Sequence, residues 1–114
     1  MTPFQILWKA IQADIHDTNV AHGFYEETKQ TPTYAAEKIA LMHSELSEAL
    51  EAIRHGNPPD SHIPEFDSVS AELADCVIRI MDYAEFFGHN VSAAIEAKMA
   101  YNKTRPYKHG KKAL

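Results

Sequence analysis

The segment from Tyr34 to His55 constrains the fold most, because its apolar residues recur three and four positions apart along its length. That spacing places them on one side of an α-helix and gives none of the alternation that a strand needs. Gly56 and Pro58 follow directly, and both residue types end helices. The segment therefore predicts a long amphipathic helix that must bury one side. Its apolar stripe consists of Ile39, Met42, Leu46, Ala49, Leu50 and Ile53.

Three further segments show the same periodicity. Thr2 is a suitable N-cap for the first, and Gly88 ends the second. Short links between amphipathic helices predict an all-α four-helix bundle, a single domain over residues 1–114 with a basic tail from about residue 103. Long helices in so small a chain also predict a homo-oligomer. The three segments run from about Pro3 to Ala21, from about Ser68 to Phe87, and from Asn90 or Ser92 to Asn102.

The composition is that of a globular protein, with 45% apolar and 24% charged residues among 114. No apolar run approaches the roughly 18 residues needed to cross a bilayer. The first residues lack the basic and apolar regions of a signal peptide. The single cysteine, Cys76, falls within a helical apolar pattern, which indicates a small buried residue. Together these features predict a cytoplasmic protein with no membrane partner.

Charge is distributed unevenly behind the net value of −5. All 16 acidic residues lie at or before Glu96, and the segment after it is basic. Such a tail can be a nucleic-acid arm, a solvated terminus, or a set of cations over phosphate groups that acidic residues hold through a metal. The acidic body argues against nucleic acid as a partner. The basic residues are Lys98, Lys103, Arg105, Lys108, Lys111 and Lys112.

Two pairs of acidic residues carry the functional signal. Glu45 and Glu48 lie three positions apart in one predicted helix, and Glu72 and Asp75 have the same spacing in the next. Each pair therefore shares a helix face at the border of the apolar stripe. If the two helices pack antiparallel, the four carboxylates converge and need a divalent cation, since burying unpaired charge is costly. Oxygen ligands favour Mg²⁺, with Mn²⁺ as an alternative.

Ordinary surface glutamates are the competing interpretation, and a single pair would favour it. Two pairs on consecutive helices favour a metal site instead. A di-iron carboxylate bundle requires Glu-x-x-His on two helices, and the sequence contains no such motif. Arg79 follows Asp75 by four positions, which predicts an ion pair between them.

These motifs resemble those of the MazG-like family of all-α nucleoside triphosphate pyrophosphatases, whose relatives include dimeric dUTPases and phosphoribosyl-ATP pyrophosphatase. The family signature is Glu-Glu-x-x-Glu on one helix and Glu-x-x-Asp on the next. Here the corresponding residues are Ser44-Glu45-x-x-Glu48 and Glu72-x-x-Asp75. Ser44 departs from the pattern, which leaves the identity of the general base open among Glu48, Glu45 and Glu37. The further matching residues are Lys38, Ile39, Lys98, Asn102, Arg105, Tyr107, His109, Gly110 and Lys111.

The resemblance, which covers about Ala35 to Lys112, implies an enzyme. It implies a Mg²⁺-dependent hydrolase that cleaves a nucleoside triphosphate between the α and β phosphates and thereby cleans the nucleotide pool. The expected substrate is a deoxynucleotide. It also implies a homodimer at least, with a tetramer of two dimers as the larger alternative. Phosphoribosyl-ATP hydrolysis, and a non-enzymatic helical interaction module with a structural cation, are the competing functions.

The expected roles follow from the resemblance and from residue type. The resemblance implies metal ligation by all four motif acids, with Glu48 and Glu45 as catalytic candidates. Aromatic and imidazole rings stack on nucleobases, so rings near the first helix are candidates for the base site, although a plain apolar core is the commoner role of such a stripe. The metal ligands would be Glu45, Glu48, Glu72 and Asp75; the phosphate-binding residues Lys98, Asn102, Arg105, Lys108 and Lys111; and the base-binding residues Trp8, His22 and Phe24.

Overall fold

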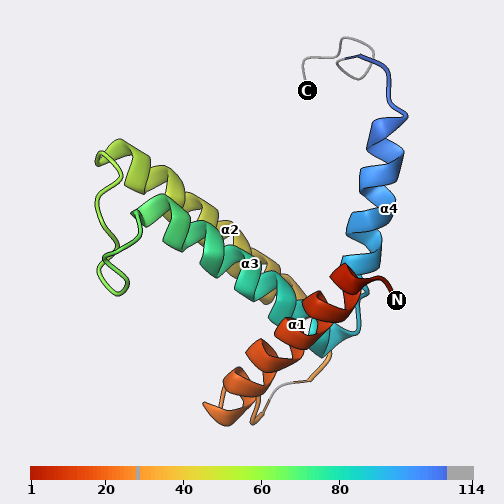
Figure 1. The fold of residues 1–114 in the computed structure, drawn as a ribbon. Coiled ribbons are helices and arrows are strands. Elements are labelled where there is room, and N and C mark those ends of the chain that lie inside the picture. Colours follow the sequence, from red (N-terminus) through yellow and green to blue (C-terminus); the bar gives the residue numbers. More distant parts are fainter. Residues whose placement is uncertain (28, 108–114) are drawn as a thin grey trace.

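The computed structural model describes residues 1–27 and 29–107, and these residues fold as four α-helices (Figure 1). The helices are α1 (Pro3–Ala21), α2 (Pro32–Arg54), α3 (Ser68–Phe87) and α4 (Val91–Lys103). Within the described residues there is no strand, and an isolated β-bridge joins Pro59 and Asp67 in the loop between α2 and α3. The all-α prediction is therefore confirmed.

Each helix begins at a side-chain cap, which explains where the helices start. The oxygens of Thr2, Thr31, Asp67 and Asn90 each accept the backbone N–H three residues further on. Thr31 caps α2 and Pro32 occupies its first position, so α2 begins at Pro32 and not at Tyr34 as the periodicity suggested. Gly88 ends α3 with φ at 76°, a left-handed conformation that glycine adopts without strain.

The arrangement of the helices centres on the antiparallel pair of α2 and α3, which lie side by side (Figure 1). α1 packs across the second half of α3, and α4 has its main contact with α1. α4 extends away from the α2–α3 pair. The buried apolar residues are small or unbranched, so the helices approach closely along their contacts. These residues are Ala49, Ala71, Cys76, Met81 and Ala84.

Much of the expected apolar stripe of α2 is exposed in the single chain. Leu50 is 54% exposed and Ile53 is 61% exposed, whereas Ala49 between them is buried. On α3, Leu73 and Val77 are exposed in the same way. Periodicity correctly identified the helices, but the four helices of one chain do not cover these side chains. Burying such side chains stabilises a protein by about 1.5–3 kcal/mol each.

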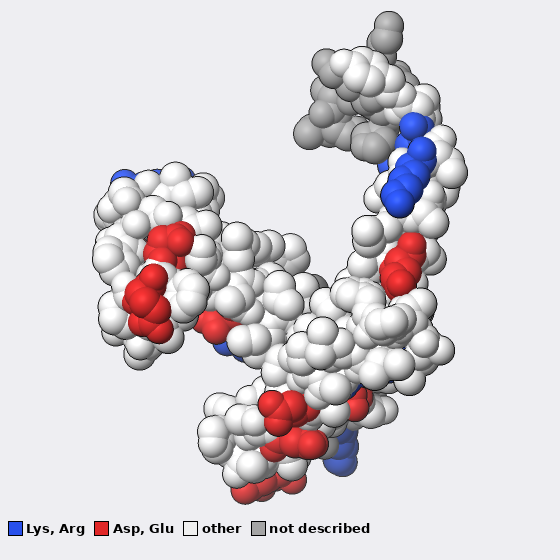
Figure 2. All heavy atoms as spheres, viewed as in Figure 1, with Lys and Arg blue, Asp and Glu red and all other residues white. Residues whose placement is uncertain are grey.

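Charged side chains gather at a few places on the face of the molecule that Figure 2 shows. Figure 2 shows acidic side chains at the loop end of the α2–α3 pair and at the lower end of α1, and basic side chains toward the far end of α4. The described basic residues of that end are Lys98, Lys103 and Arg105. No helix within residues 1–27 and 29–107 combines the length and the apolarity that crossing a membrane requires.

Candidate functional site

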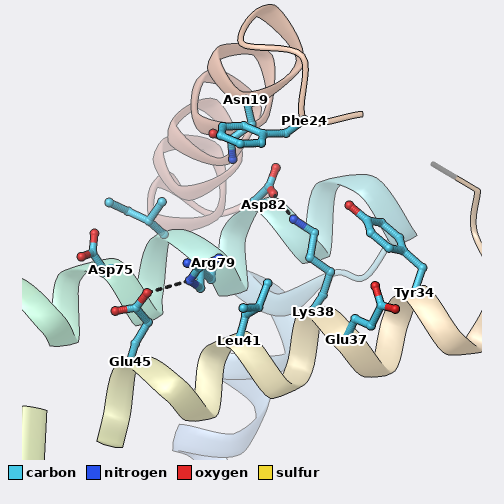
Figure 3. A pocket seen from close by; sticks show the side chains of 11 residues that line it. Asn19, Phe24, Tyr34, Glu37, Lys38, Leu41, Glu45, Asp75, Arg79 and Asp82 are labelled. Atoms are coloured by element: carbon cyan, nitrogen blue, oxygen red, sulfur yellow. Dashed lines mark hydrogen bonds and ion pairs between the residues drawn. The ribbon is translucent and has the colours of Figure 1, made fainter. Parts of the chain in front are cut away.

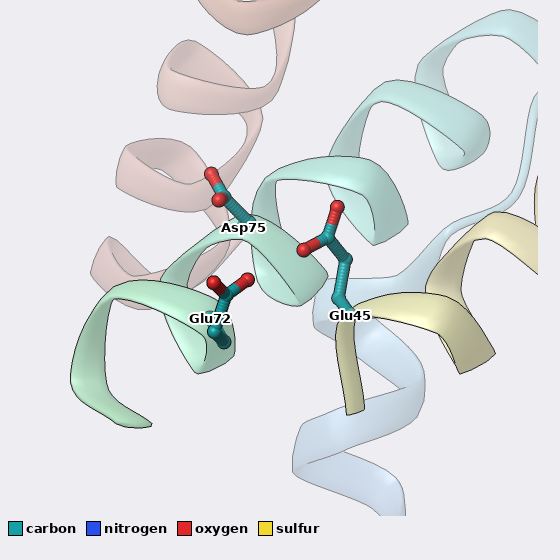
Figure 4. A group of neighbouring side chains, drawn as sticks. All are labelled: Glu45, Glu72 and Asp75. Carbon is teal, nitrogen blue, oxygen red and sulfur yellow. The ribbon is translucent and has the colours of Figure 1, made fainter. Parts of the chain in front are cut away.

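Three carboxylates from α2 and α3 converge on one point (Figure 4). Glu45 comes from α2, and Glu72 and Asp75 come from the first half of α3. One oxygen of each lies within 4.8 Å of an oxygen of the others. Glu45 is buried, Glu72 is partly buried and Asp75 is exposed, so the acidic cluster formed by these three residues opens to solvent on one side. The antiparallel packing expected from the sequence thus brings the two motifs together.

Glu48, the fourth expected ligand, lies at the edge of this cluster. Its side chain is exposed and does not belong to the converging set, but it is near enough to influence the pKa values of Glu45 and Glu72. A carboxylate in that position is close enough to take part in chemistry at the cluster while remaining in contact with water.

Crowding of these acids shifts their proton affinities. Burial, together with hydrogen bonds that protonated Glu72 donates to Glu45 and Glu48, raises the pKa of Glu72 from 4.5 to about 8. Burial and the charge of Glu45 also raise the pKa of Asp75. Burial would raise the pKa of Glu45 as well, but hydrogen bonds from Arg79 and Glu72 lower it overall. A proton or a cation is therefore favoured within the cluster.

The donor set fits a hard divalent cation. All three converging ligand atoms are carboxylate oxygens, and neither sulfur nor imidazole nitrogen takes part. A cation would also relieve the like-charge repulsion that raises the pKa of Glu72. The acidic cluster can therefore hold a metal ion, with Glu48 near enough to join or to assist.

Arg79 is paired with Glu45 and not with Asp75, so the expected ion pair within α3 is wrong. Its Nε lies 2.8 Å from Oε1 of Glu45, across the contact between the two helices. The physical reason is burial: the side chain of Glu45 is 9% exposed and needs a compensating charge, whereas Asp75 faces water.

A cavity of about 560 Å³ adjoins the acidic cluster and shares Glu45 and Asp75 with it (Figure 3). α2 and α3 form its floor, and Asn19 and Phe24 face it from the end of α1 and the loop that follows. Its walls carry both charged and apolar groups, which suits a ligand with an anionic part and a flat part. The remaining lining residues are Tyr34, Glu37, Lys38, Leu41, Ile78, Arg79 and Asp82.

Asp82 organises the end of this cavity that is remote from the acidic cluster, a role that sequence reasoning missed. It is 2% exposed, and its carboxylate accepts hydrogen bonds from Tyr25 and from Lys38, whose Nζ lies 3.3 Å away. The Nδ1 atom of His16 contacts the other oxygen. The ammonium of Lys38 also lies 5.0 Å from the centre of the Tyr25 ring and 5.6 Å from that of Tyr34.

These contacts keep Asp82 charged. Burial alone would raise its pKa, but hydrogen bonds from Tyr25 and His16, and the charge of Lys38, lower it. One signal in the sequence could have identified it. Asp82 follows Asp75 by seven positions and Arg79 by three, which places all three on one face of α3.

The three residues expected to bind the base lie in different surroundings. Phe24 lines the cavity. His22 is exposed at the C-terminal end of α1. Trp8 lies outside the cavity lining, where its indole N–H donates to Gln12 at 3.0 Å and its ring packs against Phe4. Of the three, Phe24 has the position that a base-binding residue needs.

The described residues among those expected to bind phosphate lie on or just after α4, which extends away from the acidic cluster. Lys98 and Asn102 are exposed on α4, and Arg105 follows its end. The Lys98 ammonium and the Arg105 guanidinium lie 5.2 and 5.9 Å from the ring centre of Tyr101. Lys108 and Lys111 lie outside the described residues. Among the described residues of one chain, Lys98 and Arg105 do not meet the acidic cluster.

Comparison with known proteins gave no relative: no family model, no curated protein and no solved structure matches the chain.

Proposed function

We propose that this protein is a Mg²⁺-dependent nucleoside triphosphate pyrophosphohydrolase of the MazG-like type, which converts a nucleoside triphosphate or deoxynucleoside triphosphate to the monophosphate and pyrophosphate. The observation that carries the proposal is the convergence of Glu45, Glu72 and Asp75 to within 4.8 Å beside a cavity that also contains cations and aromatic rings. Carboxylates alone would repel an anionic ligand. A bound cation reverses that charge and makes phosphate the natural ligand.

The metal would be held by the acidic cluster, with Glu48 alongside. When bound, Mg²⁺ supplies positive charge to phosphate oxygens and lowers the pKa of a coordinated water. Its preference for carboxylate oxygens and for retained water fits a cluster that is open on one side.

The reaction adds one water across one phosphoanhydride bond. The water oxygen bonds to the α-phosphorus, the bond from that phosphorus to the bridging oxygen breaks, and pyrophosphate leaves with that oxygen. Glu48 is the preferred acceptor for the proton of the water, because it is exposed and lies beside the cluster without belonging to the converging set. Glu45 is less suited to accept the proton, since it is buried and belongs to the converging set that would hold the metal.

The rest of the substrate would occupy the cavity. Phe24 offers a ring for the base, and Lys38 and Arg79 offer cations for the phosphates. The cations of α4 would come from a second copy of the chain, because their own acidic cluster is out of reach. The exposed apolar residues of α2 and α3 support such a homo-oligomer, which would give them cover. A house-cleaning role for deoxynucleotides is the biological context that fits best.

The test is an incubation of the purified protein with each common ribo- and deoxynucleoside triphosphate and Mg²⁺, with the products separated by ion exchange. We expect monophosphate and pyrophosphate from at least one substrate, with no turnover in EDTA. Glu48→Gln should lose about 100-fold or more in activity if it accepts the proton. Glu51→Gln is the matched control, because Glu51 lies on the same helix, is exposed and pairs with the neighbouring His55 and Arg54.

Other outcomes would redirect the proposal. Diphosphate with orthophosphate would contradict cleavage between the α and β phosphates. Turnover of phosphoribosyl-ATP alone would identify the related pyrophosphatase activity. Absence of turnover on every substrate, by the original protein and by Glu48→Gln alike, would favour a helical interaction module with a structural cation.

A further inference from the structure

Arg79 belongs to the acidic cluster and to the cavity at once. Its Nε donates to Glu45 at 2.8 Å, and its side chain, which is 37% exposed, lines the cavity (Figure 3). Glu45 is the buried member of the cluster, so it is the carboxylate that most needs a compensating charge. In the structure, Arg79 supplies that charge.

The same carboxylate cannot serve two cations equally. A divalent cation bound by Glu45, Glu72 and Asp75 would take over the charge that Glu45 now directs at Arg79, and would repel the guanidinium. Arg79 would then have lost its partner while still facing the cavity. A planar guanidinium binds two oxygens of a phosphate or a carboxylate at once.

We propose that Arg79 is a placeholder cation, which neutralises Glu45 while the cluster is metal-free and turns to the anionic part of a ligand in the cavity once a divalent cation binds Glu45. This inference rests on the metal site of the proposed function. It makes the binding of metal and of anionic ligand cooperative, because the first event releases the group that the second uses.

The direct test is NMR of the arginine side chains of the full-length protein during titration with Mg²⁺ alone. The chain has three arginines, Arg54, Arg79 and Arg105, so their Nε–H signals can be separated and assigned by substitution. We expect the Arg79 signal to shift and to exchange faster with water as Mg²⁺ saturates. The Arg54 signal should stay unchanged, because its guanidinium pairs with exposed Glu51.

Two results of this titration would overturn the inference. If the backbone amides of Glu72 and Asp75 respond to Mg²⁺ while the Arg79 signal does not, the placeholder role is wrong and the metal site stands. If neither these amides nor the Arg79 signal responds, both the metal site and the placeholder role are wrong. Inorganic phosphate added afterwards should shift the Arg79 signal in the Mg²⁺-loaded protein more than in the metal-free protein. An equal response in the two forms would contradict the cooperative step.

Metal affinity gives an independent test by calorimetry with Mn²⁺. Arg79→Gln removes the competing cation and should bind Mn²⁺ about three- to tenfold more tightly, since a unit charge at this distance is only partly screened. Arg79→Lys retains the charge and should bind nearly as the original protein does. Arg54→Gln is the control and should not change. Equal or weaker binding by Arg79→Gln would overturn the inference.

Discussion

The Nδ1 atom of His16 on α1 lies 2.8 Å from Oδ1 of Asp82 on α3. This contact joins the two helices through residues that are 66 positions apart in the sequence. The other oxygen of Asp82 accepts hydrogen bonds from Tyr25 in the following loop and from Lys38 on α2. One buried carboxylate therefore fixes the position of three separate segments. It also holds the ammonium of Lys38 at the wall of the cavity.

We expect Asp82→Asn to lower the free energy of unfolding by about 2–4 kcal/mol, because it removes a buried charge that Lys38 needs as its partner. The measurement is urea denaturation followed by circular dichroism. Asp17→Asn is the matched control on an exposed position of α1, with an expected change of about 0.5 kcal/mol or less. Equal stability of the two variants would contradict this role for Asp82.

The raised pKa of Glu72 predicts how the metal-free protein responds to pH. Folding raises this pKa from 4.5 to about 8, so the folded protein binds the proton more tightly than the unfolded chain does. Its contribution to stability is complete below the unfolded value of 4.5 and is lost as pH rises through about 8. In EDTA, the stability of the protein relative to Glu72→Gln should therefore fall between about pH 5 and pH 8. A constant difference would contradict the shift.

The same proton competes with a metal ion. Mn²⁺ affinity should rise with pH until Glu72 is ionised and then level off above about pH 8. Calorimetry at several pH values, in two buffers of different ionisation enthalpy, should reveal proton release that diminishes over the same range. If the Mn²⁺ affinity does not depend on pH, the metal does not displace a proton from Glu72.

The exposed apolar side chains of α2 predict self-association. Leu50→Glu places a charge where a second copy is expected to pack, so it should reduce the assembly to the mass of a single chain in sedimentation velocity. Thr33→Glu adds the same charge at an exposed polar position in the first turn of the same helix, remote from Leu50, and serves as the control. Monomeric behaviour of the unchanged protein at every concentration would argue against the homo-oligomer.

Substitutions at Phe24 and Trp8 should differ in their effect on KM. Phe24→Ala removes a ring from the cavity wall and should raise KM about tenfold, the usual scale for loss of a stacked base. Trp8→Phe changes a residue that packs outside the cavity lining and should leave KM unchanged. If Trp8→Phe has the larger effect on KM, the base site lies near α1 and not in this cavity.

The sequence was informative where local rules apply. Thr2, Asn90 and Gly88 were recognisable as helix ends, because capping depends on residue type within one turn. The convergence of Glu45 with Glu72 and Asp75 was also predictable, since it needs only two amphipathic helices packed antiparallel.

The sequence did not reveal which side chains pair with one another across helices. Arg79 had Asp75 one turn away and Glu45 on the facing helix, and burial of Glu45 decided between them. The same holds for Asp82, whose donors come from three segments at unrelated distances along the chain. The course of α4 away from the acidic cluster depends on its contact with α1, which no local pattern reveals.

The position of α4 determines how readily this helix unfolds locally. Its main support is α1, whereas α3 is packed against both α1 and α2. A helix held on one side can open while the rest of the chain stays folded, at a free energy well below that of global unfolding. In the isolated chain, the amide hydrogens of α4 would therefore exchange with deuterium from solvent much sooner than those of α3. Any neighbour that packs onto α4 would slow that exchange.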